Sequence, residues 1–191
     1  MSVSLDAMPL TELERTDGPE MAVTLINSWD EYDPEHEHLR DADVLRRWLR
    51  GNGFPRAADA VADDDVSRAR ELRSRLTAAF DAPTQAEAVE ALNALLEESG
   101  TPPQLERVDQ SWSFRSWPDE GEGLAFVGPY AALGLLEVIR DGGWERFGRC
   151  AGSPCRCVYI DRSRNRSRRF CCELCADRVA QADYRRRRRS A

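Results

Sequence analysis

Six cysteines near the C-terminus constrain this 191-residue chain more than any other feature. They lie within 26 residues, and the rest of the chain contains none. The N-terminus shows no basic stretch followed by a long apolar core, so no secretory signal is readable and we expect a cytoplasmic protein. In such a compartment, clustered cysteines indicate metal ligands before disulfides. The six positions are Cys150, Cys155, Cys157, Cys171, Cys172 and Cys175.

The spacing of these cysteines predicts one structural zinc ion. A pair separated by four residues is followed, after fifteen intervening residues, by a pair separated by three. Two short-spaced pairs supply the four thiolates of a tetrahedral zinc site, which leaves no open position for a catalytic water. A ligand set that uses Cys157 or Cys172 is an alternative, as are free or redox-paired cysteines. The predicted ligands are Cys150, Cys155, Cys171 and Cys175.

The segment between the two pairs predicts a β-hairpin. Residues 158–160 (Val-Tyr-Ile) suit one strand, residues 161–167 are polar and turn-like, and residues 168–170 would return as the second strand. If this segment stays extended, the arginines at positions 162, 164, 166 and 168 share one face. A helix is expected after Cys175. A module of about 40 residues is too short to fold without a metal or disulfides.

Charge divides the chain at the same place. Residues 149–191 hold 13 arginines against 4 acidic residues, whereas residues 1–148 hold 14 arginines against 30. All basic residues are arginine, which is permanently charged and can fork onto phosphate or guanine. An acidic body with a basic tail is typical of proteins that bind nucleic acid or another anionic surface.

The first 148 residues predict an acidic, mainly helical domain, so that the fold class is mainly α with a small β content (α+β). Apolar residues at helical spacing, ended by glycines or turns, indicate four helices. These are expected at residues 41–50, 63–80, 84–99 and 129–140. Residues 20–31 suit a buried strand or the start of a helix, and residues 105–117 suit one or two short strands. We divide the chain into a flexible N-terminus (1–18), a helical domain (19–148) and a basic zinc module (149–191).

The C-terminal segment resembles the CGNR-type zinc finger. The resemblance is carried by the cysteines, the arginine-rich run at 161–169 and the sequence Cys175-Ala-Asp-Arg178. This finger closes bacterial proteins described as stress-induced transcription regulators, whose N-terminal part is called the ABATE domain. Residues 25–29, 44–49 and 72–73 are similar to patterns of that domain, so the resemblance covers roughly residues 19–189. It implies a zinc-dependent regulator that binds DNA.

Two residues of the signature differ from the family pattern. Ala176 stands in place of glycine, which removes backbone freedom at the start of the helix. Asp177 stands in place of asparagine, which removes a side chain able to read adenine through two hydrogen bonds and adds a negative charge. Arg178 is retained.

The basic segment predicts a nucleic-acid interface, with DNA as the expected partner. Docking of the tail on RNA or on an acidic protein is the alternative, and the acidic body could also mask the tail. Arginines in the hairpin and on one stripe of the helix would contact phosphates or base edges. The predicted contacts are Arg162, Arg164, Arg166, Arg168, Arg169, Arg178, Arg185 and Arg189.

The helical domain could bind a small effector. Its large aromatic residues (Trp29, Trp48, Trp112, Phe114 and Trp117) are expected to pack in the core. If a pocket exists, Asn27 and Arg73 are its predicted polar residues, because both lie beside apolar stripes and match positions of the family pattern. A homodimer would suit a regulator that reads two half-sites.

No catalytic constellation is readable, so we expect a protein that is not an enzyme; an enzyme in the helical body, with the zinc module as a structural appendage, is the remaining alternative. The run Glu35-His36-Glu37-His38 tempts a metal-site interpretation, but no third histidine exists and Pro34 favours a polar loop. We also expect no membrane partner. The most apolar stretch, residues 131–139, is interrupted by Glu137 and is shorter than the roughly 20 residues that a membrane helix needs.

Overall fold

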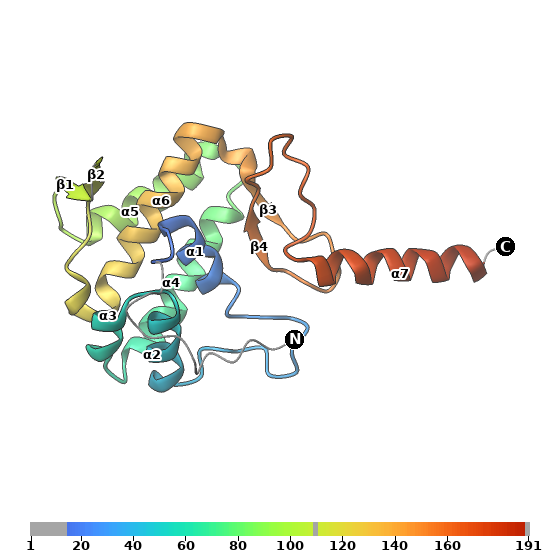
Figure 1. Cartoon of the computed structure of the whole chain (residues 1–191), viewed down its shortest axis with the longest axis horizontal. Helices are drawn as coiled ribbons and strands as arrows, with labels where there is room; N and C mark the ends of the chain where they lie inside the picture. The colour runs from blue at the N-terminus through green and yellow to red at the C-terminus, as the bar shows by residue number, and fades with distance from the viewer. Residues whose placement is uncertain (1–14, 109–110, 190–191) are drawn as a thin grey trace.

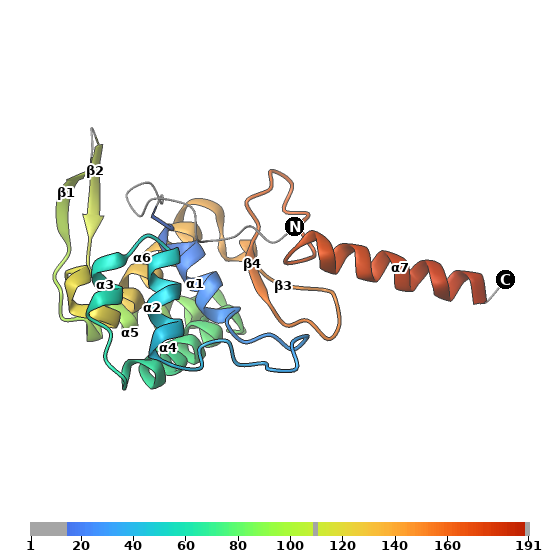
Figure 2. The same ribbon diagram turned by 60° about the horizontal axis from the view of Figure 1, so that its bottom comes forward.

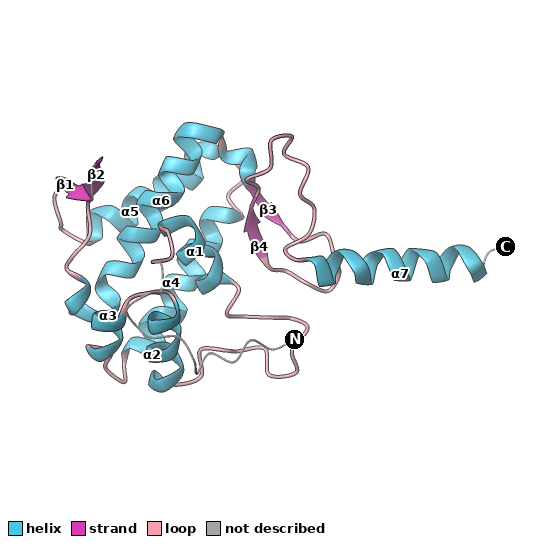
Figure 3. Ribbon diagram, in the orientation of Figure 1, coloured by secondary structure: helices cyan, strands magenta, loops and turns pink. Residues whose placement is uncertain are grey.

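A computed structural model describes residues 15–108 and 111–189, and helices dominate it (Figures 1 and 3). The predicted flexible N-terminus, residues 1–18, falls mostly outside the described residues. The body contains α1 (Gly18–Ile26), α2 (Ala42–Gly51), α3 (Pro55–Asp59), α4 (Asp65–Phe80), α5 (Gln85–Glu98), η2 (Glu120–Phe126) and α6 (Val127–Gly142). The C-terminal segment contains η3 (Trp144–Arg146), β3 (Phe147–Arg149), β4 (Val158–Ile160) and α7 (Glu173–Arg189).

The helices of the body begin where the sequence offers side-chain caps. Thr84 and Glu87 form the reciprocal capping box of α5, and Asp41 accepts a hydrogen bond from the Val44 N–H at the start of α2. Residues 20–31, for which the sequence left strand or helix open, begin with α1, capped by Asp17. The mainly α prediction is therefore confirmed. The short helix α3 lies in a segment for which the sequence analysis predicted no helix.

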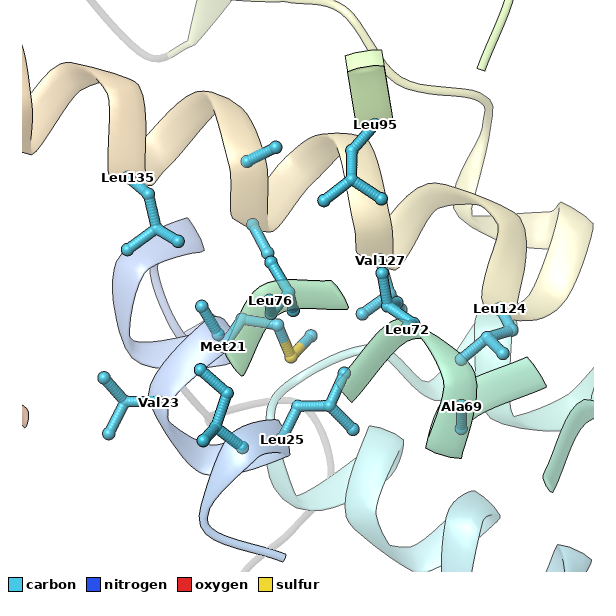
Figure 4. Packing of buried hydrophobic residues seen from close by; sticks show 14 of the residues in the cluster. Met21, Val23, Leu25, Ala69, Leu72, Leu76, Leu95, Leu124, Val127 and Leu135 are labelled. Atoms are coloured by element: carbon cyan, nitrogen blue, oxygen red, sulfur yellow. The ribbon is translucent and has the colours of Figure 1, made fainter. Parts of the chain in front are cut away.

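The larger apolar core lies where α1 crosses α4 and α6. Met21, Leu25, Leu76 and Leu135 are completely buried there, and Figure 4 shows their side chains interdigitating. Each buried leucine contributes roughly 1.5–3 kcal/mol relative to an exposed one. The core continues into the C-terminal segment, because Val158 and the neighbouring Ile160 belong to the same cluster.

The segment Gly121–Gly142, made of η2 and α6, is long and apolar enough to cross a membrane by length and composition. This corrects the expectation that the apolar stretch is too short, which counted residues 131–139 alone. Most of the segment is buried inside the body, which is the behaviour of a core helix in a folded domain.

Two short antiparallel hairpins lie at opposite ends of α6 (Figures 1 and 2). One pairs β1 (Gln104–Val108) with β2 (Ser111–Arg115), as the alternation in residues 105–117 predicts. Its aromatic residues depart from the core packing that we expected. Trp112 is 66% exposed and Phe114 is 59% exposed. A two-stranded ribbon has no second layer to cover its apolar side chains, so these stay in solvent.

The second hairpin corrects the predicted pairing of the zinc module. β4 forms where expected, but its partner is β3, which precedes the first cysteine, and residues 168–170 form no strand. Asp161 explains why the chain does not continue as a strand. Its buried carboxylate accepts hydrogen bonds from the N–H groups of Ser163 (2.8 Å) and Arg168 (2.9 Å), which closes a loop.

Candidate metal centre and nucleic-acid interface

The four predicted cysteines come together at one point. The Sγ atoms of Cys150, Cys155, Cys171 and Cys175 all lie within 4.8 Å of one another. The Cys155–Cys171 and Cys171–Cys175 sulfur separations are both 3.7 Å. Four thiolates at about 2.3 Å from a tetrahedral zinc ion would lie roughly 3.8 Å apart, so the cluster has the dimensions of a zinc site.

The hairpin and α7 bring the two pairs together. Cys150 and Cys155 lie in the β3–β4 connection, where the Cys150 N–H donates to the Cys157 carbonyl at 2.9 Å. Cys171 precedes α7, and Cys175 lies in its first turn. The Ala151 N–H donates to the Arg169 carbonyl at 2.8 Å, which holds the returning segment beside the first pair.

The two remaining cysteines lie outside this group of four. Cys172 is exposed, with its sulfur 3.8 Å from that of Cys171, and Cys157 is half-buried at the end of the β3–β4 connection. All six cysteines are free thiols, so the redox-paired alternative has no disulfide to support it. The group of four therefore consists of the predicted ligands, and a ligand set with Cys157 or Cys172 stays an alternative.

The β3–β4 hairpin, which forms the root of the zinc module, is joined to the body by three kinds of contact. Asn27 at the end of α1 donates through Nδ2 to the Val158 carbonyl (3.0 Å) and accepts from the Val158 N–H at Oδ1 (2.8 Å). Phe147 stacks on Phe80, with ring centroids 4.6 Å apart. Arg149 forms a bidentate ion pair with Asp81 at 2.5 Å. β3 and β4 are therefore part of the body's structure as much as of the zinc module.

Tyr32 is a site residue that the sequence analysis missed. It packs against the cysteine cluster from the body's loop at residues 28–40, and its hydroxyl donates to the Ser153 carbonyl at 2.9 Å. The Arg178 guanidinium lies over its ring, 3.9 Å from the centroid. Only a polar loop was readable at this position, because nothing local indicates a contact with residues more than a hundred positions away.

The arginines of the loop at residues 161–170 do not share one face as predicted, since the segment is not extended and Arg166 adopts a positive φ of 49°. Arg162 pairs with Asp17 at 2.7 Å, and Arg166 pairs with Glu145 at 3.7 Å. Arg168 folds back onto the backbone of Phe170 and Cys171. Arg164 and Arg169 are exposed, and Arg169 lies over the ring of Phe170.

The predicted helix after Cys175 is present as α7, which extends away from the rest of the molecule (Figures 1 and 2). Cys175 is its buried residue, and Arg185 to Arg189 are all exposed. Arg178, Arg185 and Arg189 fall on one face because they are spaced by seven and four residues. Basic residues in the last turn also suit the negative end of the helix dipole.

The predicted effector residues line one pocket of about 470 Å³, but their polar groups already have partners. Asn27 is bound to Val158. Arg73 is 9% exposed and donates to Ser28 Oγ at 2.9 Å and to both carboxylate oxygens of Glu37. Burial opposes the charge of Glu37, yet the hydrogen bonds from Arg73 and the Leu39 N–H outweigh it and hold the pKa of Glu37 below its ordinary value.

Two family models match this chain. The ABATE model, described as "putative stress-induced transcription regulator", matches residues 20–142. The chain belongs to the ABATE family. A CGNR zinc finger model matches residues 146–188 of this ABATE protein, and the two matches meet at the end of α6. No curated protein matches the chain. The zinc-finger match and the geometry of the four-cysteine cluster together identify a single structural zinc site.

Proposed function

We propose that this ABATE protein is a transcription regulator that binds duplex DNA through α7 and the loop at residues 161–170. One observation carries the proposal: α7 begins at the zinc cluster and ends in five consecutive exposed arginines that stand clear of the body. A protein whose partner is chromosomal DNA acts in the cytoplasm of a bacterial cell, which agrees with the location expected from the sequence.

The dimensions of α7 suit a DNA groove. Its 17 residues give a length of about 25 Å, and the major groove is about 12 Å wide, enough to admit a helix. Arg185 and Arg189 lie on the same face, while the three arginines between them reach the flanking phosphates. The zinc site holds the first turn of the helix, so its direction relative to the body is defined by Cys171 and Cys175.

The body's carboxylates oppose this binding at the loop. Arg162 and Arg166 already pair with Asp17 and Glu145, so each must exchange a carboxylate for a phosphate when DNA binds. These exposed pairs are weak, because solvent screens them, and a polyanion can displace them. We therefore expect the exposed arginines of α7 to dominate the affinity and the loop arginines to add less.

Fluorescence anisotropy of a labelled duplex across a salt series tests the proposal. The full zinc-loaded chain is required, because β4 shares the body's core. If six to eight arginines contact phosphates, log K falls with log salt at a slope of roughly −5 to −7. A slope near zero, or no binding at low salt, would overturn the DNA assignment; tighter binding to a single-stranded RNA of the same length would replace it with the RNA alternative.

A pair of single substitutions makes the test specific to α7. Arg185→Gln removes one exposed arginine from the helix, and Arg47→Gln removes one exposed arginine from α2 on the body. The first is expected to reduce the salt slope by about one, and the second to leave it unchanged. Equal effects of the two would show that the attraction is diffuse rather than located on α7.

The small effector and the homodimer remain parts of this proposal. Asn27 and Arg73 are the predicted effector residues, and their existing hydrogen bonds mean that a ligand there must compete with Val158 and Glu37. Sedimentation velocity, with and without a duplex carrying two half-sites, tests the dimer. A single monomeric species under both conditions would remove it.

A further inference from the structure

A pocket that the effector prediction did not include runs along the outer face of α6, between the β1–β2 hairpin and the root of the zinc module. Its volume is about 580 Å³, within the range of small-molecule sites. Figures 1 and 2 show the two hairpins at either end of this helix. The lining that matters here comprises Asp17, Phe114, Trp117, Tyr130, Glu137 and Arg162.

The floor of the pocket lies where α1 and α6 come into close contact. α1 crosses α6 at Gly18 and Gly134, and a Cβ atom on Gly134 would lie 2.4 Å from the Cδ of Pro19. The two helices therefore meet through the Pro19 ring and the two glycine backbones, and no larger residue at Gly134 can fill the floor. Since both helices belong to the core, this part of the pocket is present before a ligand arrives.

One wall is aromatic. The rings of Trp117 and Tyr130 have centroids 4.8 Å apart and an interplanar angle of 81°, so they form a corner. The Tyr130 hydroxyl donates to the Thr16 carbonyl at 2.8 Å, which fixes that ring. Phe114, 59% exposed, extends the wall onto the hairpin. Rings set at right angles offer their faces to a cation or to the edge of another ring.

The charges at the mouth decide the sign of the ligand. Glu137 is exposed and forms no ion pair or hydrogen bond among residues 15–108 and 111–189, although Arg140, one turn further along α6, attracts it electrostatically. The arginines are already used: Arg162 pairs with Asp17, and Arg146 donates to the Asp161 carbonyl at 2.7 Å. The group without a partner is therefore a carboxylate, which attracts a cation and repels an anion.

We propose that this pocket binds an organic cation with an apolar, ring-sized body. The body of the ligand lies in the corner of Trp117 and Tyr130, and its ammonium group lies toward Glu137. Both interactions favour the same ligand class, because the ring faces and the carboxylate attract positive charge. The geometry of the pocket supports this proposal independently of DNA binding.

Its regulatory meaning rests on the proposed function. The Asp17–Arg162 ion pair joins the body to the arginine-rich loop at one end of the pocket. A cation held at Glu137 in the same pocket repels the Arg162 guanidinium and so weakens its ion pair with Asp17, and a released Arg162 is available to a phosphate. Ligand binding is thus expected to strengthen DNA binding by about twofold to fivefold.

Isothermal titration of the full zinc-loaded chain, without DNA, tests the site. Benzyltrimethylammonium is the probe, with benzyl alcohol as the neutral comparator and phenylacetate as the anionic one. We expect saturable binding of one equivalent of the cation, with a Kd at least about tenfold lower than for benzyl alcohol. Equal affinity for the cation and the alcohol, or no saturation by the cation, would overturn the proposal.

Variants locate the probe. Glu137→Gln is expected to raise the Kd about fivefold, and Phe114→Ala to raise it by a similar factor, because both side chains are exposed and can change without loss of the fold. Glu90→Gln on α5, another exposed carboxylate, is the control and is expected to leave the Kd unchanged. If Glu137→Gln has no more effect than Glu90→Gln, the site is wrong.

The effect of the probe on DNA binding is tested in a separate experiment. Adding the probe to the anisotropy titration tests only the release of Arg162, and an unchanged DNA affinity would overturn that step. A chain that binds the probe and no DNA would contradict the proposed function and leave the pocket assignment intact.

Discussion

The two halves of the zinc module differ in how they relate to the body. β3 and β4 are joined to it by a shared apolar cluster, by the Asn27–Val158 hydrogen bonds and by the Arg149–Asp81 ion pair. α7 contacts it near the first turns, where Arg178 lies over Tyr32, and the rest of the helix stands in solvent. The same zinc site holds both halves.

A metal site can therefore be structural for two purposes at once. Toward the body, the zinc completes a fold whose core already includes Val158 and Ile160. Toward solvent, it orients α7, which is rich in arginine and offers few apolar side chains for packing. The stability of the fold is therefore expected to depend on the β3–β4 half, and DNA binding on α7. The two properties should respond to different substitutions.

Removal of zinc is expected to have the largest effect on stability, and it tests whether the zinc module and the body unfold together. Zinc sites in small fingers contribute about 10–16 kcal/mol to folding. Because β4 belongs to the body's core, Cys175→Ser or chelation should lower the Tm of the whole chain by more than about 10 °C. The tryptophans of the body report this in a fluorescence melt.

The spare thiols supply the control for that experiment. Cys157→Ser and Cys172→Ser are expected to retain one equivalent of zinc and the original Tm, because both residues lie outside the cluster. A body whose melting is unaffected by chelation would show that the module is independent of it. Loss of zinc from either control would instead enlarge the ligand set.

Asn27→Ala tests the junction itself. The substitution leaves the N–H and the carbonyl of Val158 without their partner, and we expect a loss of about 2 kcal/mol in the free energy of unfolding. Asn93→Ala, at an exposed position of α5, is the matched control and should change it by less than about 0.5 kcal/mol. Urea denaturation measures both. Equal values would mean that the junction is held by apolar contacts alone.

The Glu37–Arg73 ion pair holds the loop that carries Tyr32, and it makes the stability depend on pH. The pKa of Glu37 is lowered in the folded chain, so its contribution is present above the ordinary value of 4.5 and is lost as the pH falls through the lower, folded value. Glu37→Gln should cost about 1 kcal/mol at pH 7, since the pair is partly exposed. The difference from the original chain should narrow below pH 4, and a constant difference would contradict this account.

Removal of residues 181–191 is expected to have the smallest effect on stability. Residues 181–189 of α7 lie beyond its first turns and contain no fully buried side chain, so the Tm should change by less than about 2 °C. The same deletion should abolish most of the salt-dependent DNA binding. A large fall in Tm would show that the helix supports the fold and would remove the contrast between the two halves.

Local signals predicted the helices and the metal cluster, and distant contacts account for what was missed. The Thr84–Glu87 capping box and the two cysteine pairs act over a few residues, so the sequence displays them. The pairing of β4 with β3 depends on a loop closed by Asp161, and Asn27 meets a residue 131 positions away. The exposure of Trp112 could not be predicted either, because apolar character does not reveal whether a second layer will cover it.

The place of β4 in the core has a consequence for how the chain is made. Val158 and Ile160 leave the ribosome long after α1, which begins at residue 18 and against which β4 packs. Domains usually fold from the N-terminal side during synthesis, at about 5–20 residues per second. Here the core of the body cannot be completed until β4 has emerged, and the segment that completes it also carries the cysteines that must capture the metal.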